Sequence, residues 1–180
     1  MWKKTLLLMG LIALTAAQVN AQSVNFGPQV GYYKVRDADQ GNLMGGLALR
    51  VKLLPVIGVE GSINYRQEKY ADGAVTVRSW PVMVTGLIYP LPIVYGAMGF
   101  GWYNTTIDYD QTKVPSLKDE TTQKIGWHLG GGVELPVGSS LKLTADIRYV
   151  FLNYDFKKIP GRDNLNSNFY VLTVGFLFGL

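Results

Sequence analysis

The sequence predicts an all-β fold: an eight-stranded antiparallel up-and-down transmembrane β-barrel with short turns at one end and longer loops at the other. Two observations predict it. Apolar residues alternate with polar or small residues along eight segments, and a period of two is that of a strand with one apolar face. The links between these segments are alternately tight and long, which is the pattern of a membrane barrel. Closing the sheet also leaves no unpaired edge in lipid.

Length and composition favour one domain with a core of its own. The chain has 180 residues, of which 48% are hydrophobic and 17% charged, and so low a charged share argues against disorder. It has no cysteine and one histidine, which excludes disulfide scaffolds, thiol catalysis, zinc knuckles and two-histidine metal sites. Without Lys3 and Lys4 the net charge of +4 falls to about +2 (15 basic minus 13 acidic residues), too weak to indicate a nucleic-acid partner.

Residues 1–21 are expected to be a cleaved secretory signal peptide. Lys3 and Lys4 supply its positive start, and an apolar run of 13 residues follows from Thr5 to Ala17. The alternative is an N-terminal membrane anchor, but a helix needs about 20 residues to span a bilayer. We therefore expect cleavage after Ala21, export from the cytoplasm, and a barrel domain over residues 22–180.

The eight strands are expected, in chain order, at residues 24–35, 43–53, 57–66, 76–88, 94–104, 123–135, 141–151 and 170–180. Each segment has one apolar face, and the split is poorest in 76–88. The apolar faces of the second, third, fifth, sixth, seventh and eighth segments include, in that order, Leu47 and Val51, Val59 and Ile63, Met98 and Phe100, Trp127 and Leu129, Ile147 and Tyr149, and Val174 and Phe176. The opposite faces carry charged residues or glycine.

Residues 79–107 carry no charge, and a hydropathy window would score them as a membrane helix. Pro81, Pro90 and Pro92 interrupt this stretch, and prolines break the hydrogen bonding of a helix. It is therefore interpreted as two strands joined at 89–92. The other tight links are expected at 54–55 and 136–140, and the long polar links at 36–42, 67–75, 108–122 and 155–167.

The apolar face of the barrel is expected to contact lipid. In a soluble ligand-binding barrel this face would point inward, but an eight-stranded interior is only wide enough to be filled by side chains and could not hold so many large apolar residues. Glycines crowd the opposite face, as a narrow interior requires. Aromatic residues near strand ends are typical of the belts at membrane surfaces. They are Tyr32, Tyr65, Tyr89, Trp102, Tyr149 and Tyr170.

The last residues resemble the C-terminal signal of bacterial outer-membrane barrels, in which Thr173, Gly175, Phe178 and Leu180 fill the signal positions. Together with residues 96–103 and 130–135, they make the chain resemble the small OmpA/OmpX-type and opacity-like barrels, often called porin family proteins. The resemblance implies a monomer in the bacterial outer membrane with both termini in the periplasm. It also implies four kinds of partner, namely outer-membrane lipid, lipopolysaccharide, the barrel-assembly machinery and periplasmic chaperones, and no nucleic acid.

With the apolar face outside, a polar network is expected inside the barrel. Its members are Arg50, Lys52, Glu60, Arg66, Lys124, His128, Glu134, Lys142, Asp146 and Arg148. The expected turns place Arg50 opposite Glu60, Glu134 opposite Lys142, and His128 opposite Arg148. Buried charges need partners, so these residues are interpreted as a structural plug of ion pairs. The alternative is a narrow pore, in which the excess of basic residues would favour anions.

No enzyme activity and no cofactor or metal are expected. Some eight-stranded barrels that this chain resembles modify lipid A with a His-Ser-acid set, but the position two residues after His128, where the deacylase type has its serine, is Gly130. Arg148 beside His128 would also disfavour an imidazolium. Asp108, Asp110, Asp119 and Glu120 match no ordered calcium-ligand spacing.

The loops are the other expected place for function, because binding residues are often carried on loops. Lys157, Lys158 and Arg162 in the segment 155–167 are candidates for contact with lipopolysaccharide phosphates, unless this is an ordinary solvated loop. The sequence thus predicts a non-catalytic outer-membrane barrel with a role in envelope integrity or in surface interaction through its loops.

Overall fold

The fold is described from a computed structural model of the chain, for residues 23–35, 41–70, 75–109, 120–152 and 168–180. The expected signal peptide at 1–21, most of the expected loop at 36–42, and Lys157, Lys158 and Arg162 lie outside these residues. Within the described residues, no helix has the length and hydropathy needed to span a bilayer.

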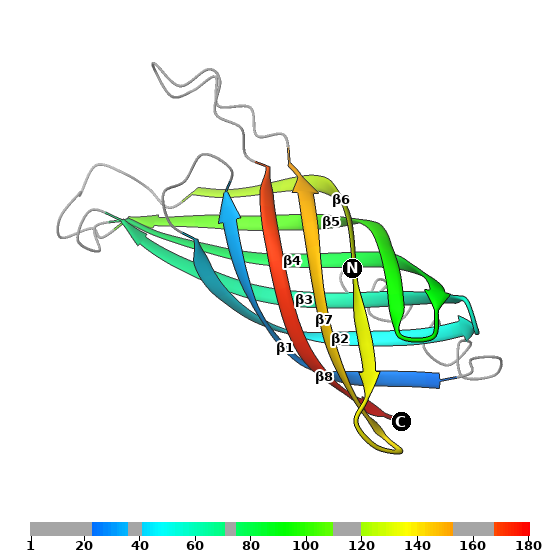
Figure 1. The fold of residues 1–180 in the computed structure, drawn as a ribbon. Coiled ribbons are helices and arrows are strands. Elements are labelled where there is room, and N and C mark those ends of the chain that lie inside the picture. Colours follow the sequence, from blue (N-terminus) through cyan, green and yellow to red (C-terminus); the bar gives the residue numbers. More distant parts are fainter. Residues whose placement is uncertain (1–22, 36–40, 71–74, 110–119, 153–167) are drawn as a thin grey trace, which may run out of the picture.

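The described residues form eight antiparallel strands that close into a barrel in sequence order, β1 to β8 (Figure 1). The fold class expected from the sequence is therefore confirmed. The strands are β1 (Ser23–Val35), β2 (Asn42–Leu54), β3 (Ile57–Tyr70), β4 (Val75–Leu91), β5 (Val94–Tyr109), β6 (Glu120–Pro136), β7 (Leu141–Phe151) and β8 (Phe169–Gly179). Tight turns follow β2, β4 and β6, and we call this end of the barrel the turn end and the other the loop end.

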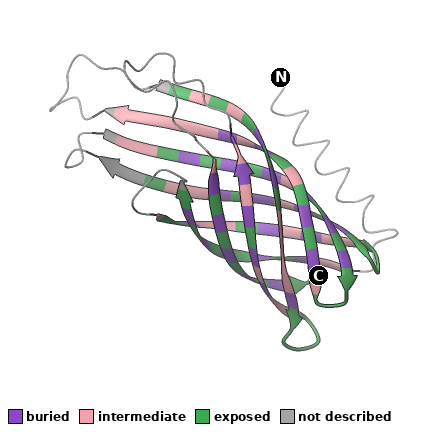
Figure 2. Cartoon of the chain, turned by 45° about the horizontal axis from the view of Figure 1, so that its top comes forward, coloured by how far each residue is buried: buried purple, intermediate pink, exposed green. Residues whose placement is uncertain are grey.

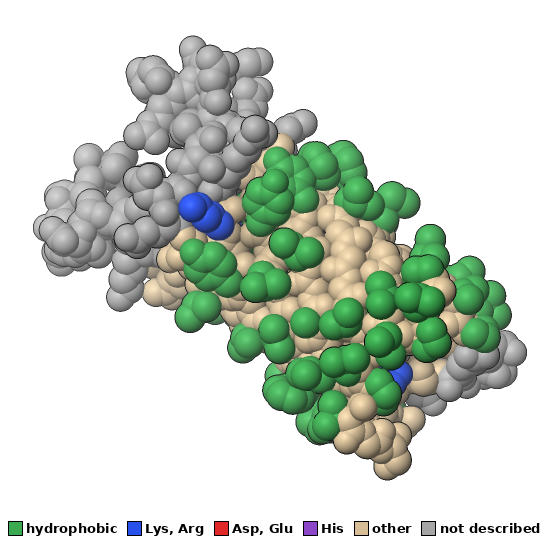
Figure 3. Space-filling view, viewed as in Figure 1, with side chains coloured by type: hydrophobic (Ala, Val, Ile, Leu, Met, Phe, Trp, Pro, Cys, Tyr) green, Lys and Arg blue, Asp and Glu red, His purple; other side chains and the backbone are tan. Residues whose placement is uncertain are grey.

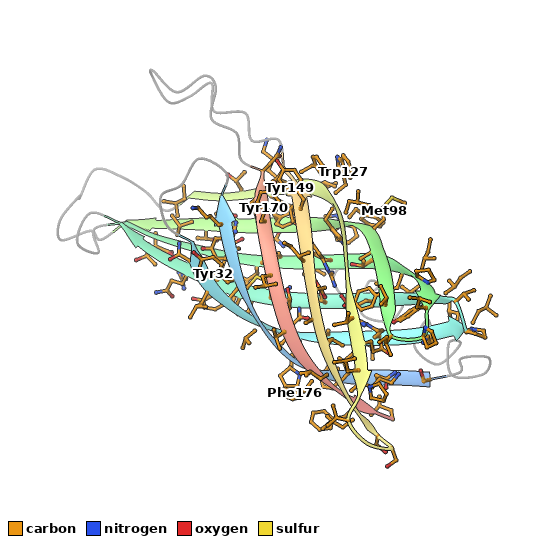
Figure 4. The ribbon with its side chains drawn as sticks, in the orientation of Figure 1. Tyr32, Met98, Trp127, Tyr149, Tyr170 and Phe176 are labelled. Carbon is orange, nitrogen blue, oxygen red and sulfur yellow. The ribbon has the colours of Figure 1, made fainter. Side chains whose placement is uncertain are left out.

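Burial alternates along every strand, as a barrel with one face inside and one outside requires (Figure 2). On β3, for example, Glu60 is 1% exposed and Ile63 is 44% exposed. On the face shown in Figure 3, hydrophobic side chains are spread over the outer surface between the two ends, and the aromatic residues labelled in Figure 4 point outward from their strands. The apolar face of the alternation is therefore the exterior.

Four neighbouring strands are longer than the sequence predicts. β3, β4, β5 and β6 have 14, 17, 16 and 17 residues, whereas β7 and β8 have 11 each. The pairing of β2 with β3 ends at Arg66 and that of β6 with β7 at Trp127, so β3 to β6 project beyond the rest at the loop end (Figure 1). The predicted loops 67–75 and 108–122 are thus partly strand. The parts of these loops that lie in strands, at 67–70, 75, 108–109 and 120–122, are mostly polar and carry no apolar alternation, although their backbones pair.

Two of the predicted tight turns are present with shifted bounds. β4 continues to Leu91, so the predicted turn at 89–92 shortens to residues 92–93. The turn after β2 falls at Pro55 and Val56, one residue later than predicted.

The barrel closes by pairing β1 with β8, the two strands farthest apart in sequence. Thr173 and Gly175 of the expected C-terminal signal face inward, whereas Phe178 lies outside and pairs with Phe26 of β1. Leu180 donates its backbone N–H to the Val24 carbonyl at 2.9 Å. The chain end is thus fastened to the first strand at the turn end.

Candidate functional site

Glu60 on β3 lies at the centre of a buried ion-pair network inside the barrel. Its cross-strand neighbour Arg50 on β2 donates from Nε to Oε2 at 3.0 Å, in the register that the sequence predicts. Arg148 on β7 donates from Nη2 to the other oxygen, Oε1, at 2.7 Å. β3 and β7 are four strands apart in the closed order, so this contact crosses the interior of the barrel.

Glu134 on β6 is the second carboxylate of the network. It accepts from Arg50 Nη1 at 2.8 Å, from Lys142 Nζ at 2.9 Å and from the Tyr89 hydroxyl at 2.8 Å. The guanidinium of Arg50 therefore joins Glu60 and Glu134, which come from strands β3 and β6.

Asp146 on β7 is the third carboxylate. It accepts from Nε and Nη2 of Arg148 at 2.9 and 3.1 Å, and from the Tyr95 hydroxyl at 2.9 Å. Arg50 in turn donates to that hydroxyl from Nη2 at 3.1 Å. Three bases thus meet three acids, and every buried charge of the network has an opposite partner, as burial in a low dielectric demands.

The predicted register between β6 and β7 is wrong by two residues. Glu134 lies opposite Thr144 rather than Lys142, and His128 opposite Val150 rather than Arg148. The cause is the turn, which centres on Ser139 instead of Gly138, so that each cross-strand partner moves by two positions. The Glu134–Lys142 ion pair forms nonetheless, because the lysine side chain is long enough to span the shift.

The other predicted network members lie outside this cluster. Lys52 places its ammonium 3.9 Å from the Tyr89 ring centroid, near the turn end. Arg66 lies over the rings of Tyr33 and Phe169, at 4.4 and 4.9 Å. Lys124 is half-buried in the outer part of β6.

Tyr89 corrects an expectation of the sequence, which placed it in an exterior aromatic belt. It is 2% exposed and bonds to Glu134 inside the barrel. Tyr89 lies two and four positions after Leu87 and Thr85 on the same strand, so its side chain points to the same, inward face. Because apolar and polar residues alternate poorly in the 76–88 segment, the sequence does not reveal which of its residues face inward.

His128 on β6 is fully buried and bonds to a threonine. Its Nε2 lies 2.9 Å from Thr85 Oγ1, and the same hydroxyl accepts from Arg148 Nη1 at 3.1 Å. The Nδ1 atom has no hydrogen-bond partner within the described part of the chain, and the same holds for Ser62 Oγ. Among the described residues no serine hydroxyl is paired with this imidazole, so the geometry required for an activated nucleophile is not present there.

A layer of apolar side chains occupies the loop-end half of the interior. It is formed by buried residues of β1, β2, β4, β5, β7 and β8 and by Leu152 just after β7: Tyr33, Met44, Met83, Tyr103, Val150, Leu152, Phe169 and Val171. Tyr103 and Tyr33 pack edge-to-face on Phe169, with centroids 5.9 and 6.2 Å apart. Sequence reasoning missed this layer, because its members sit at inward positions of strands whose outward residues are even more apolar.

Asp108 lies at the loop end of β5, not in a loop. Arg78 on β4 donates from Nε to Oδ2 and from Nη2 to Oδ1 of Asp108, both at 2.6 Å. Among the described residues, no group of three or more acidic, histidine or cysteine side chains is arranged to hold a metal ion.

The sequence profile of the outer membrane protein beta-barrel domain matches residues 5–178. The chain belongs to the outer membrane β-barrel domain family. Its place is therefore the bacterial outer membrane. No curated protein sequence matches the chain.

Solved barrels of this class share the fold at low sequence identity. Neisserial surface protein A is 11% identical over 86% of this chain and 94% of its own, with a TM-score of 0.62. A major outer membrane protein from Thermus thermophilus is 16% identical over 87% and 99%, with a TM-score of 0.61. Ail, the attachment invasion locus protein of Yersinia pestis, is 15% identical over 88% and 97%, with a TM-score of 0.56.

Proposed function

We propose that this outer-membrane barrel is a non-catalytic, closed scaffold that supports the envelope and presents its loops at the cell surface. The observation that carries the proposal is that side chains occupy both halves of the interior. The ion-pair network around Glu60 fills the turn-end half, which we place toward the periplasm, and the apolar layer around Phe169 fills the loop-end half.

Two chemically different barriers in series support a closed interior better than either would alone. A hydrated ion passing through would have to separate paired charges such as Arg50–Glu60. It would then have to enter a constriction lined by apolar side chains, and such constrictions exclude water. An eight-stranded barrel has little width to spare for both.

The surface role is assigned to the loops, which in this protein include Lys157, Lys158 and Arg162. Basic side chains bind phosphate and sulfate groups through charge-assisted hydrogen bonds. Ail, which shares the fold, was crystallised with the heparin analogue sucrose octasulfate. We propose that the three basic residues contact an anionic saccharide of the cell surface, with lipopolysaccharide as the nearest source.

The test begins with refolded protein in detergent, run on a gel with and without boiling and then inserted into a planar bilayer. A heat-modifiable band without discrete conductance steps is the expected result. Reproducible steps would contradict the closed scaffold and favour a narrow pore. For the surface role, a triple variant with Lys157→Ala, Lys158→Ala and Arg162→Ala is expected to lose binding to immobilised lipopolysaccharide while keeping the heat-modifiable band. Unchanged binding would contradict the assignment to these residues.

A further inference from the structure

The exterior of β4, β5 and β6 carries a shallow apolar hollow of about 380 Å³. It is lined by Val84, Gly86, Met98, Phe100 and Trp127 and by the backbone of Gly99. Met98, Phe100 and Trp127 are about half exposed or more and form its walls. In Figure 4, Met98 and Trp127 point outward from their strands.

Gly86 is the outward-facing glycine in the lining of the hollow, and packing does not require a glycine there. A Cβ added at Gly86 would meet only the Met98 carbonyl oxygen, at 3.6 Å, and one added at Gly96 would meet nothing within 4 Å. Gly96 pairs directly with Gly131 of β6. By contrast, a Cβ at Gly99, which faces inward, would collide with the Val84 carbonyl. Gly86 and Gly96 thus leave space open where a side chain would fit, whereas a Cβ at Gly131 would lie 2.9 Å from the Tyr95 carbonyl oxygen.

The hollow lies in the loop-end half of the barrel, which in the proposed orientation is the outer-leaflet side of the membrane. Trp127 at its loop-end edge pairs with Phe151, the last residue of β7, and their rings stack at 3.8 Å. Farther toward the loop end, Trp102 and Trp80 are outward aromatic residues of the kind that marks the boundary between acyl chains and headgroups. The hollow therefore lies inward of that boundary, in the part of the bilayer that acyl chains occupy.

Farther toward the loop end, beyond Ile125, Trp102 and Trp80, the outward side chains of the same strands become polar. Gln123 Nε2 on β6 donates to Asn104 Oδ1 on β5 at 2.7 Å, and Asn104 Nδ2 donates to the Trp80 carbonyl on β4 at 3.3 Å. The Arg78–Asp108 pair lies next to them on β4 and β5. Amides and a guanidinium beside an aromatic ring are the groups that bind saccharide hydroxyls and phosphates.

We propose that the outer face of β4, β5 and β6 binds one glycolipid of the outer leaflet, of the lipid A class. One acyl chain lies in the hollow over Gly86, and the phosphorylated sugar headgroup contacts Asn104, Gln123 and Arg78. An apolar recess with a polar strip of amides and an arginine beyond its loop-end edge matches an amphipathic lipid. A second copy of this chain would bring no phosphate to that strip. This site is separate from the loop residues proposed above and does not depend on whether the lumen conducts.

The experiment is native mass spectrometry of the refolded barrel after titration with lipid A, with phosphatidylglycerol as the competing source of acyl chain and phosphate. The wild type is expected to retain one lipid A and to prefer it at least tenfold to phosphatidylglycerol. Gly86→Leu fills the hollow and is expected to reduce this retention at least tenfold. Gly45→Leu is the matched control, because Gly45 faces outward on β2 with nothing within 4 Å of an added Cβ.

Heat-modifiability verifies that each variant is folded. If Gly86→Leu does not fold, the double variant with Asn104→Ala and Gln123→Ala tests the headgroup half and is expected to lose the preference for lipid A. Equal retention by the Gly86→Leu and Gly45→Leu variants would overturn the proposal. So would equal binding of lipid A and phosphatidylglycerol by the wild type. A dimer mass that Gly86→Leu abolishes would show instead that a second copy covers the hollow.

Discussion

Arg148 on β7 donates a hydrogen bond to Glu60 on β3 across the interior of the barrel, with Nη2 and Oε1 2.7 Å apart. No backbone hydrogen bond joins these two strands, because three others separate them on either side of the closed sheet. The ion pair therefore links opposite walls through side chains alone. Since Glu60 also holds Arg50, one carboxylate fixes two guanidiniums.

Glu60→Gln is expected to lower the free energy of unfolding by about 3–5 kcal/mol, because removing one member of a buried ion pair leaves the other charge uncompensated. Here two arginines lose their counter-charge at once. Urea titration of the barrel in lipid vesicles, followed by the heat-modifiable band, measures the change.

The control for Glu60→Gln is Asp108→Asn, which breaks the Arg78–Asp108 pair at the loop end. Arg78 is about half exposed, and exposed pairs contribute at most about 1 kcal/mol. Equal losses for the two variants would contradict the central role given to Glu60.

Gly99→Ala is expected to destabilise the barrel by about 1–3 kcal/mol, the usual cost of overpacking. Its Cβ would collide with the Val84 carbonyl and lie 2.9 Å from His128 Nε2. Gly96→Ala, on the outside of the same strand, should leave stability nearly unchanged. Comparing their urea midpoints in one lipid separates interior crowding from the general effect of replacing glycine in a strand.

Conductance is expected only when both interior layers are opened. Glu60→Ala removes the centre of the network but leaves the apolar layer, and the double variant with Tyr103→Ala and Phe169→Ala does the reverse. Both should be silent in planar bilayers, whereas the triple variant should show discrete steps. Conductance from Glu60→Ala alone would mean that the apolar layer is no barrier.

Phe178→Ala is expected to reduce assembly in the outer membrane of living cells severalfold without impairing refolding in detergent. Phe26→Ala is the matched control, since the two rings pair across the β1–β8 seam and both face lipid. Only Phe178 belongs to the expected signal for the barrel-assembly machinery. The folded fraction in outer-membrane preparations is the readout, and equal defects in both variants would indicate lost packing rather than lost recognition.

Alternation predicted the strand number, and alternation together with the glycines, the aromatic residues and the narrow interior predicted which face lies outside. The pairing of Arg50 with Glu60 was predicted from a turn at 54–55. The turn lies one residue later, and a register shift between Lys52 and Leu54 restores the predicted pairing. Between β6 and β7 the link is longer, and glycine and serine at 138–140 allow several centres. The register there was therefore missed by two residues.

Contacts between strands that are not neighbours could not be predicted. The approach of Arg148 to Glu60 depends on how far the sheet staggers around the barrel, which the sequence of either strand does not encode. The loop-end extension of β3 to β6 was missed for another reason. Polar pairs such as Thr106 and Thr121 are joined by their hydroxyls at 3.1 Å, and alternation cannot distinguish such a water-exposed strand from a loop.

The β1–β8 seam has a consequence for the timing of folding. β8 is synthesised after the seven other strands, yet it supplies the partner for residues 25–35 of β1. Until it arrives, the sheet has two open edges, and open edges pair readily with other chains. The ring cannot close before β8 has been synthesised, so closure of the barrel must follow the synthesis of its last strand. A chain interrupted before β8 would be a template for aggregation rather than a smaller barrel.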